Sequence, residues 1–194
     1  MLREHGRELS YEVFRPTFGL RNDDVLVQHL GFEEDRERIA ALSERKEELF
    51  RASLERRGLQ MQRGARELVR HLHAIGAHQA IASSAPPLNI DVMVRLMGLG
   101  EYFDVVVSSE EVTRGKPAPD IVLRATGRLG LPASRVVVLE DAPAGVAAGK
   151  AAGCRVIAIE AAFPAESLVS ADLIVHSFLE VLWPPARWEA FLGG

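Results

Sequence analysis

The sequence is poor in the features that mark several classes of protein. It contains a single cysteine, Cys154, so no disulfide can form within the chain, and this scarcity is typical of a reducing compartment. No stretch approaches the roughly 18 consecutive apolar residues of a membrane-spanning helix. Residues 1–10 lack the apolar segment of a signal peptide. We therefore expect a cytoplasmic protein with no membrane partner.

Basic residues are also too few for a nucleic-acid surface. The chain has 23 Lys and Arg against 27 Asp and Glu, a formal net charge of −4. Binding to phosphate backbones draws on clustered lysine and arginine, so we expect no nucleic-acid partner. The apolar content of 47% and the charged content of 26% are those of an ordinary globular protein.

Two nucleotide-binding fingerprints are missing as well. No Gly-x-Gly-x-x-Gly segment occurs, which removes the usual signal for a dinucleotide site. The segment 145–151 resembles a P-loop only in part, because three residues instead of four separate its glycines. Ala151 follows Lys150, where a P-loop needs Ser or Thr. We reject both interpretations.

Two patterns of hydrophobicity divide the chain into residues 1–60 and 61–194. The first part contains no convincing strand, and apolar residues in 33–57 recur at helical spacing. In the second part helical and strand patterns alternate, and a helical tail with Trp183 and Trp188 closes it. Strands are expected at 78–82, 103–107, 135–139, 155–159 and 171–175. The alternation predicts an α/β, Rossmann-like three-layer α/β/α core with a parallel sheet, preceded by a small α-helical subdomain.

Polar side chains follow the predicted strands at the points where ligands bind in such sheets. Glu140 and Asp141 end the apolar run 136–139, and paired carboxylates suit Mg²⁺. Ser83 and Ser84 follow the strand 78–82, where hydroxyl and backbone N–H groups can hold a phosphate. Lys116 is held between a glycine and a proline-rich turn, which favours a phosphate-binding role.

Each of these groups also has a purely structural interpretation. Glu140 and Asp141 can cap the following helix and interact with its dipole. Ser83 and Ser84 can cap the helix after their strand, and an isolated lysine is usually a solvated charge. Taken one at a time, the residues leave both interpretations open.

Taken together, the segments 82–84, 115–120 and 140–145 resemble the motifs of the haloacid dehalogenase superfamily of phosphohydrolases, in the form of its β-phosphoglucomutase-like branch. The order of serine, lysine and acidic pair, each after a strand, carries the resemblance. It covers essentially the whole chain, because the helical segment of about 19–58 is similar to the α-helical cap of that branch. The resemblance implies a cap at 1–60 with an incomplete N-terminus and a core at 61–194.

The resemblance also implies roles for individual residues. Ser83 and Lys116 would be catalytic and would bind the transferring phosphoryl group, with Ser84 beside it. Glu140 and Asp141 would hold Mg²⁺. In the cap, Arg21 and Lys46 fall near positions that contact the distal part of a substrate, although a solvated helix face explains them equally well. The implied partner is a small phosphorylated metabolite, most simply a sugar phosphate.

One part of the family pattern is missing from these 194 residues. The nucleophile of the family is the first Asp of an Asp-x-Asp segment that ends the first strand, and no Asp-x-Asp occurs here. Asp23 and Asp24 are adjacent and follow no apolar strand. We therefore expect the chain as given to be inactive through a truncation. Phosphomutase activity and a non-catalytic relative that binds phosphorylated ligands are the alternatives.

The missing strand has a structural consequence. In the family it lies between the strands that here end at Ala82 and Leu139. Those two strands must then pair directly or leave edges that are prone to association. We expect the complete protein to be a monomer and the chain as given to be poorly stable or to associate.

Overall fold

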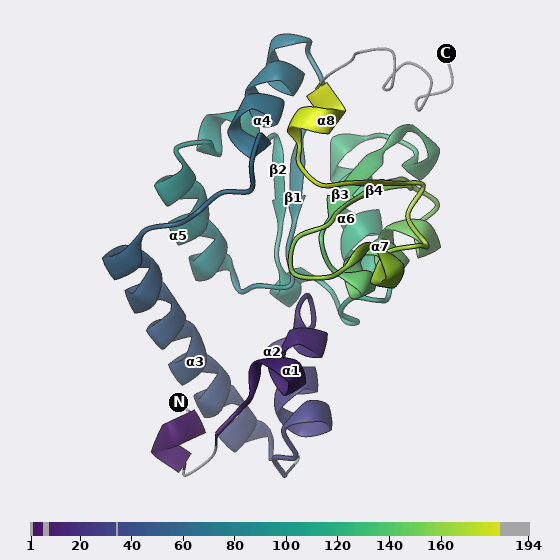
Figure 1. Cartoon of the computed structure of the whole chain (residues 1–194). Coiled ribbons are helices and arrows are strands. Elements are labelled where there is room, and N and C mark those ends of the chain that lie inside the picture. The colour runs from purple at the N-terminus through teal and green to yellow at the C-terminus, as the bar shows by residue number, and fades with distance from the viewer. Residues whose placement is uncertain (1, 6–7, 34, 183–194) are drawn as a thin grey trace.

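The computed structural model describes residues 2–5, 8–33 and 35–182 (Figure 1). The expected tail with Trp183 and Trp188 lies outside these residues. In the described part, no helix is long and apolar enough to cross a membrane. The expected mixed α/β architecture with parallel strands is confirmed.

The first described strand begins at Ala80, so the preceding segment is helical or irregular. Its longest helix, α3, starts where Asp35 accepts hydrogen bonds from the amides of Glu37 and Arg38, and it stops at Gly58, whose φ of 75° suits glycine. The helices here are α1 (Tyr11–Phe14), α2 (Asn22–Asp24), a π-helical turn (Val25–His29) and α3 (Arg36–Arg57), with 3₁₀ turns at Leu2–His5 and Arg15–Thr17. Leu26, Phe32, Ile39 and Leu42 form a small core of their own.

From Ala65 onward helices and strands alternate as the sequence predicts. The helices are α4 (Ala65–Ala74), α5 (Pro87–Met97), α6 (Asp120–Leu129), α7 (Pro143–Ala151) and α8 (Leu179–Leu182). The strands are β1 (Ala80–Ala82), β2 (Val105–Val107), β3 (Val137–Glu140), β4 (Arg155–Ile159) and β5 (Leu173–Val175). Short 3₁₀ turns lie at Gly100–Tyr102, Ser109–Glu111, Ala133–Arg135 and Ala165–Ser167. Glycine and proline set these boundaries: Pro143 opens α7, and Gly98 and Gly130 end α5 and α6 with positive φ.

The strands form two parallel sheets instead of the single sheet that the alternation predicted. One contains β1 and β2, with Ile81 opposite Val106, and the other contains β3, β4 and β5 in that order. Helix α6 packs against β1 and β2 and also against α7, so it joins the two sheets from one face. The strands that end at Ala82 and Glu140 do not pair with each other. Within the described residues the facing edges of these two strands are therefore unpaired, which is the second of the two expected outcomes.

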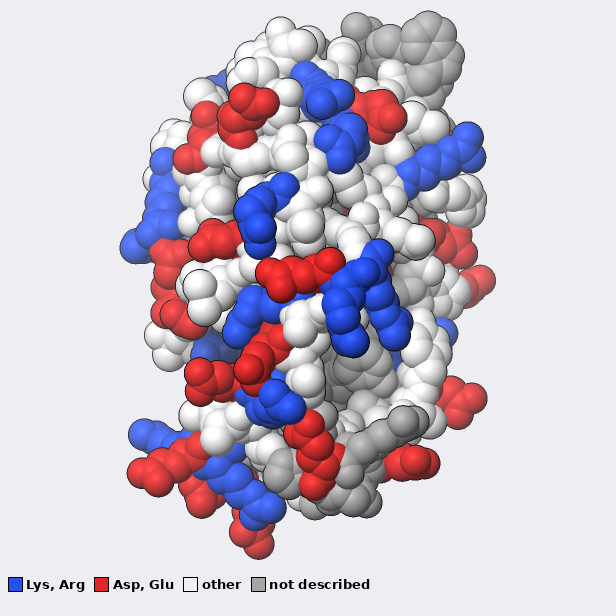
Figure 2. All heavy atoms as spheres, turned by 90° about the vertical axis from the view of Figure 1, so that its left-hand side faces the viewer, with Lys and Arg blue, Asp and Glu red and all other residues white. Residues whose placement is uncertain are grey.

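Charged side chains are interspersed on the face that carries α3 and α5. Figure 2 shows acidic and basic residues beside one another there, and Arg95 of α5 lies 3.6 Å from Glu55 of α3. This face therefore does not carry the single-sign basic surface that nucleic-acid binding requires.

The unpaired edges lead to a prediction about the isolated chain. We expect the 194-residue protein to unfold at a low temperature or to associate as its concentration rises, because two strand edges lack their neighbour. Thermal unfolding and sedimentation over a hundredfold range of concentration measure both effects. A sharp melt of a monomer, independent of concentration, would contradict this prediction.

Candidate active site

The predicted site residues of the core surround one cavity of about 520 Å³ at the carboxyl ends of β1 and β3. Helix α3 of the N-terminal segment forms the opposite wall. The core supplies Ser83, Ser84, Lys116, Glu140 and Asp141, and α3 supplies Lys46, Glu47 and Phe50. The structure thus brings together residues of α3 and residues at the ends of β1 and β3 that are far apart in the sequence.

The two serines after β1 have different surroundings. The hydroxyl of Ser83 accepts a hydrogen bond from the amide of Ala85 at 3.2 Å, which fixes the turn that leads into α5. The hydroxyl of Ser84 donates to the carbonyl of Gly19 at 2.7 Å and so ties the N-terminal segment to the core. Both serines line the cavity, and Ser84 in addition holds the N-terminal segment against the core.

Lys116 lies in a loop that other side chains hold in place. Its side chain is buried, with 8% of the residue exposed, and its Nζ pairs with Oε1 of Glu140. Next to it, the guanidinium of Arg114 binds both carboxylate oxygens of Asp120 at 3.1 and 2.8 Å. This bidentate pair anchors the loop to the start of α6. Lys116 is therefore a positioned cation at the cavity wall and not a solvated one.

Glu140 and Asp141 have different surroundings. The carboxylate of Glu140 lies against Gly145 in the first turn of α7, so a Cβ at position 145 would displace that carboxylate. Asp141 lies exposed at the cavity mouth. Desolvation against the cavity wall, and secondarily the charge of Glu140, raises the pKa of the Asp141 carboxyl.

This donor set fits a magnesium ion that is completed by a phosphorylated ligand. Mg²⁺ commonly binds one or two carboxylates together with water and substrate phosphates. Among the described residues no cluster of three or more His, Cys, Asp or Glu side chains forms a ready-made metal cage. Asp141 is exposed and lines the cavity, whereas Glu140 is already paired with Lys116.

A polar network at the far wall of the cavity escaped the sequence analysis. Glu47 is buried, and its carboxylate accepts hydrogen bonds from Lys46 at 2.5 Å, from Asn22 at 2.6 Å and from Asn89. Arg51 in turn donates to Asn89 at 2.8 Å. The hydrogen-bond partners come from α2, α3 and α5, so no local sequence motif identifies them. The only signal was the position of Glu47 next to Lys46.

Burial alone would raise the pKa of the Glu47 carboxyl. The hydrogen bonds from Lys46, Asn22 and Asn89, with the positive charge of Lys46, outweigh that effect, and the pKa is lowered overall. Glu47 therefore carries a negative charge at neutral pH and keeps the ammonium of Lys46 at the cavity wall.

Of the two cap residues that the resemblance pointed to, only Lys46 lines this cavity. Arg21 donates to the carbonyls of Val112 and Thr113 at 3.3 and 3.1 Å and lines a separate hollow of about 360 Å³. A Cβ on Gly115 would lie 2.6 Å from the Cδ of Arg21. Arg21 therefore contacts the loop that carries Lys116, while a role toward substrate stays a prediction.

The family of the chain follows from a comparison of sequences. The model of the haloacid dehalogenase-like hydrolases matches residues 2–153. The chain belongs to this family. Hexitol phosphatase A of Escherichia coli K12 is 41% identical over 118 residues, a match that covers 61% of this chain and 54% of that protein. The chain spans 32%, 57% and 54% of the lengths of three curated relatives that it matches, from about a third to somewhat more than a half.

Solved structures of haloacid dehalogenase-like hydrolases share its fold. A mutant of CbbY from Rhodobacter sphaeroides, in complex with xylulose-(1,5)bisphosphate, has a TM-score of 0.83 and 26% identity, covering 92% of this chain and 84% of that one. A β-phosphoglucomutase from Clostridium difficile has a TM-score of 0.84 and 18% identity, covering 97% and 85%. The second likeness concerns the fold alone.

Proposed function

We propose that the protein is a Mg²⁺-dependent phosphohydrolase that acts on a small phosphorylated metabolite through an aspartyl-phosphate. The observation that carries this proposal is the meeting of Ser83, Lys116 and Asp141 around one cavity in a haloacid dehalogenase-like hydrolase. These groups supply a phosphate-binding hydroxyl, a buried cation and a carboxylate for the metal. Phosphoryl transfer depends on such positioning and charge stabilisation.

In this proposal each residue has a separate task. Ser83 and Lys116 bind the transferring phosphoryl group, with Ser84 beside it, and Asp141 with Glu140 holds Mg²⁺. The ion would neutralise the phosphate oxygens as charge develops on them. The attacking aspartate is not among the 194 residues, because no Asp-x-Asp segment occurs in them. Residues 1–60 would act as a cap over the core at 61–194.

The polar wall opposite the phosphate groups favours a sugar phosphate as the substrate. Lys46 and Asn22 present donors and an acceptor on this wall, where they are partly exposed to a cavity of about 520 Å³, and the buried Glu47 holds both by hydrogen bonds. Hydroxyl groups act as both donors and acceptors, so a polyol fits such a wall. The hexitol phosphatase and the CbbY complex agree with this class, since their names refer to sugar alcohol and sugar phosphates.

The test compares the 194-residue chain with a form extended before Met1 by an apolar strand that ends in Asp-x-Asp. We expect the extended form to release phosphate from sugar phosphates only with Mg²⁺, and the unextended chain to release none. The control is the same extension with Asn in place of the first Asp. Absence of phosphate release and of mutase activity from a panel of phosphate esters would refute the proposal.

A non-catalytic ligand-binding function is the second candidate, and the lack of an Asp-x-Asp segment favours it. The unextended chain would then bind a phosphorylated sugar through Ser83 and Lys116 without turnover. Calorimetric titration of this chain with sugar phosphates, with and without Mg²⁺, measures such binding. This function would be favoured over hydrolysis if the unextended chain bound sugar phosphates tightly and the extended form released no phosphate from them.

Replacement of Asp141 by asparagine is expected to separate activity from stability. The raised pKa means that the folded state binds a proton more tightly than the unfolded state. Stability therefore falls as the pH rises from the ordinary value of 3.8 through the raised pKa. Asp141→Asn removes this loss, so at pH 7 the variant should be at least as stable as the parent.

In the extended form the same variant should lose Mg²⁺-dependent phosphate release by at least about a hundredfold, because the ion loses its open carboxylate. Denaturant unfolding at pH 5 and 7 and a phosphate assay measure the two effects. Asp91→Asn, at an exposed position of α5 outside the cavity, is the control for activity. A variant that is both unstable and active would contradict the role of Asp141.

A further inference from the structure

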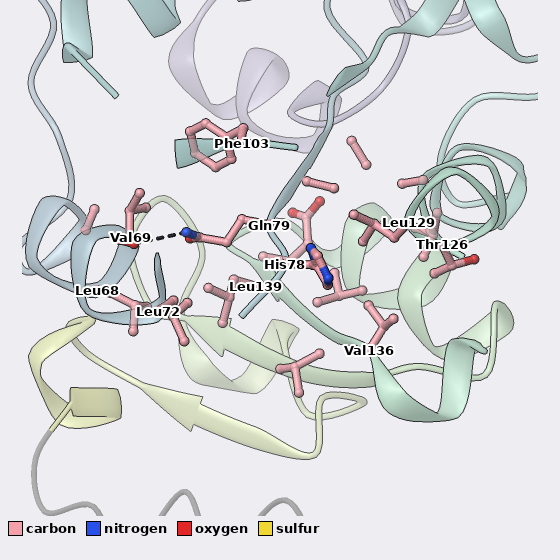
Figure 3. A pocket seen from close by; sticks show the side chains of 18 of the residues that line it. Leu68, Val69, Leu72, His78, Gln79, Phe103, Thr126, Leu129, Val136 and Leu139 are labelled. Atoms are coloured by element: carbon pink, nitrogen blue, oxygen red, sulfur yellow. Dashed lines mark hydrogen bonds between the residues drawn. The ribbon is translucent and has the colours of Figure 1, made fainter. Parts of the chain in front are cut away.

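A second cavity, of about 250 Å³, lies between the two sheets and does not suit a sugar phosphate. Figure 3 shows that apolar side chains such as Leu68, Leu72 and Leu129 surround much of it, and the side-chain amide of Gln79 already donates to the carbonyl of Val69 at 3.0 Å. The hydroxyl groups of a polyol would find few partners there. Such a ligand therefore belongs in the cavity of about 520 Å³ that contains the proposed phosphate site.

The charged side chains of that larger cavity lie on two walls. The core wall carries Lys116 with Glu140 and Asp141, and the wall formed by α3 carries Lys46 with Glu47. Among the described residues no arginine lines the cavity. Both lysines are paired with a glutamate, so neither wall presents an unbalanced cation.

The ammonium of Lys46 has two acceptors within the protein. It lies 2.5 Å from the carboxylate of Glu47 and 2.7 Å from the side-chain oxygen of Asn22. The side chain of Lys46 is 40% exposed and that of Glu47 only 7%. Because an ammonium has three N–H groups, one of them remains available to a ligand. The α3 wall thus offers a donor whose charge is already compensated.

The negative charge that compensates Lys46 is fixed in place. Besides the ammonium, Asn22 donates to the carboxylate of Glu47 at 2.6 Å, and the buried Asn89 donates to its second oxygen. These hydrogen bonds lower the pKa of Glu47, so the carboxylate is ionised at neutral pH. Arg51 donates to Asn89 but lines a separate hollow beside Glu48, so its charge is not presented to the cavity.

A compensated ammonium treats neutral and anionic ligands differently. A hydroxyl group can accept the remaining N–H of Lys46 and donate to Asn22 without any change in charge. A carboxylate or a second phosphate would lose its hydration in the cavity, while repulsion from Glu47 would offset its attraction to Lys46. The core wall differs, because the Mg²⁺ of the proposed function would add positive charge beside the transferring phosphate.

We propose that Glu47 is a specificity-determining residue, which cancels the charge of Lys46 and so limits the substrate to esters that carry one phosphate and an uncharged polyol end. This inference rests on the proposed function, because it requires that Ser83 and Lys116 hold the phosphate. It adds to that function the rejection of bisphosphates and of phosphorylated sugar acids.

The test uses two pairs of ligands that differ in one charged group. Sorbitol 6-phosphate and 6-phosphogluconate share a chain of six carbons, and the second has a carboxylate in place of a terminal CH₂OH. Glucose 6-phosphate and glucose 1,6-bisphosphate differ by one phosphate. Calorimetric titration of the 194-residue chain with Mg²⁺ measures binding without turnover. We expect the first member of each pair to bind at least about tenfold more tightly than the second.

The variant Glu47→Gln assigns this preference to the carboxylate. Glutamine keeps the length of the side chain and one acceptor oxygen, and it leaves Lys46 as an uncompensated cation. We expect the preference for sorbitol 6-phosphate over 6-phosphogluconate to fall by at least about tenfold. A purely structural role of Glu47 would weaken both ligands alike. Glu48→Gln, in an exposed pair with Arg45, is the matched control and should keep the preference of the parent.

The outcomes separate this proposal from the proposed function. Equal binding within the pairs by the parent, or an unchanged preference in Glu47→Gln, would overturn the specificity and leave the phosphohydrolase proposal standing. Absence of binding by all these ligands would instead refute the phosphate site on which both proposals depend. Circular dichroism verifies the fold of both variants. If Glu47→Gln does not fold, the preference of the parent decides, because an anion-binding wall would reverse it.

Discussion

Replacement of Lys116 by methionine should destabilise the folded chain by about 3–5 kcal/mol, the usual cost of removing one partner from a buried ion pair. The side chains of Lys116 and Glu140 are 9% and 12% exposed. Without the ammonium, the carboxylate of Glu140 stays buried against α7 with no compensating charge. Denaturant unfolding at pH 7 measures the loss.

Two controls separate the charge effect from packing. The double variant Lys116→Met/Glu140→Gln should recover most of the lost stability, because a neutral pair leaves no buried charge behind. Lys150→Met removes a partner of Asp172 from a pair whose side chains are 38% and 33% exposed. Such a pair contributes at most about 1 kcal/mol. Equal losses in the variants of Lys116 and Lys150 would show that burial of the first pair has no energetic consequence.

Replacement of Glu47 by leucine should cost about 3 kcal/mol or more. The change leaves the amides of Asn22 and Asn89 without their shared acceptor, and a buried group so abandoned costs about 1–3 kcal/mol. It also leaves the ammonium of the partly exposed Lys46 without its ion pair. Glu48→Leu is the matched control on the same helix. The side chain of Glu48 is 62% exposed and pairs with Arg45, so its loss should cost at most about 1 kcal/mol.

The lowered pKa of Glu47 adds a pH dependence to this prediction. A carboxyl whose pKa is lower in the folded state stabilises the protein above its ordinary value of 4.5. That contribution is lost as the pH falls through the lower folded value. The parent should therefore lose stability below about pH 4.5 faster than Glu47→Gln does. Parallel slopes in the two unfolding curves would contradict this assignment.

Stability in this molecule therefore depends partly on polar groups that also line the proposed substrate cavity. The pair of Lys116 and Glu140 stabilises the side of the cavity that the core forms, and Glu47 stabilises the side that α3 forms. Substrate contacts and folding are not independent at these positions. Activity measurements on their variants need the stability controls given above.

Local signals in the sequence were sufficient for the helices and strands. Asp35 and Gly58 bound α3, Pro143 opens α7, and the apolar run before Glu140 forms β3. These features act on the backbone within one turn or one strand, so a single sequence contains them. The strands were predicted one or two residues too long at some ends, as at His78 and Phe103, where pairing stops earlier than the apolar pattern.

The motif residues of the core were also accessible from the sequence, because they follow strands and the ends of parallel strands meet at one edge. That rule brought Ser83, Lys116 and Asp141 to one cavity. It could not tell that Glu140 turns back over Gly145 to pair with Lys116. Side-chain direction depends on packing that the order of residues does not specify.

The other contacts of the site depend on how distant parts of the chain pack together. Glu47 and Asn89 lie 42 positions apart and meet through the packing of α3 on α5. Arg21 donates to the loop that carries Lys116 and does not line the cavity of the proposed site. The structure has two sheets instead of the expected single one, because β1 and β3 lie on either side of a cavity of about 250 Å³ and do not pair with each other. Helices, strands and the polar residues at their ends depend on near neighbours in the chain, so they could be predicted from the sequence. Contacts across the fold depend on how the whole chain packs, so they could not.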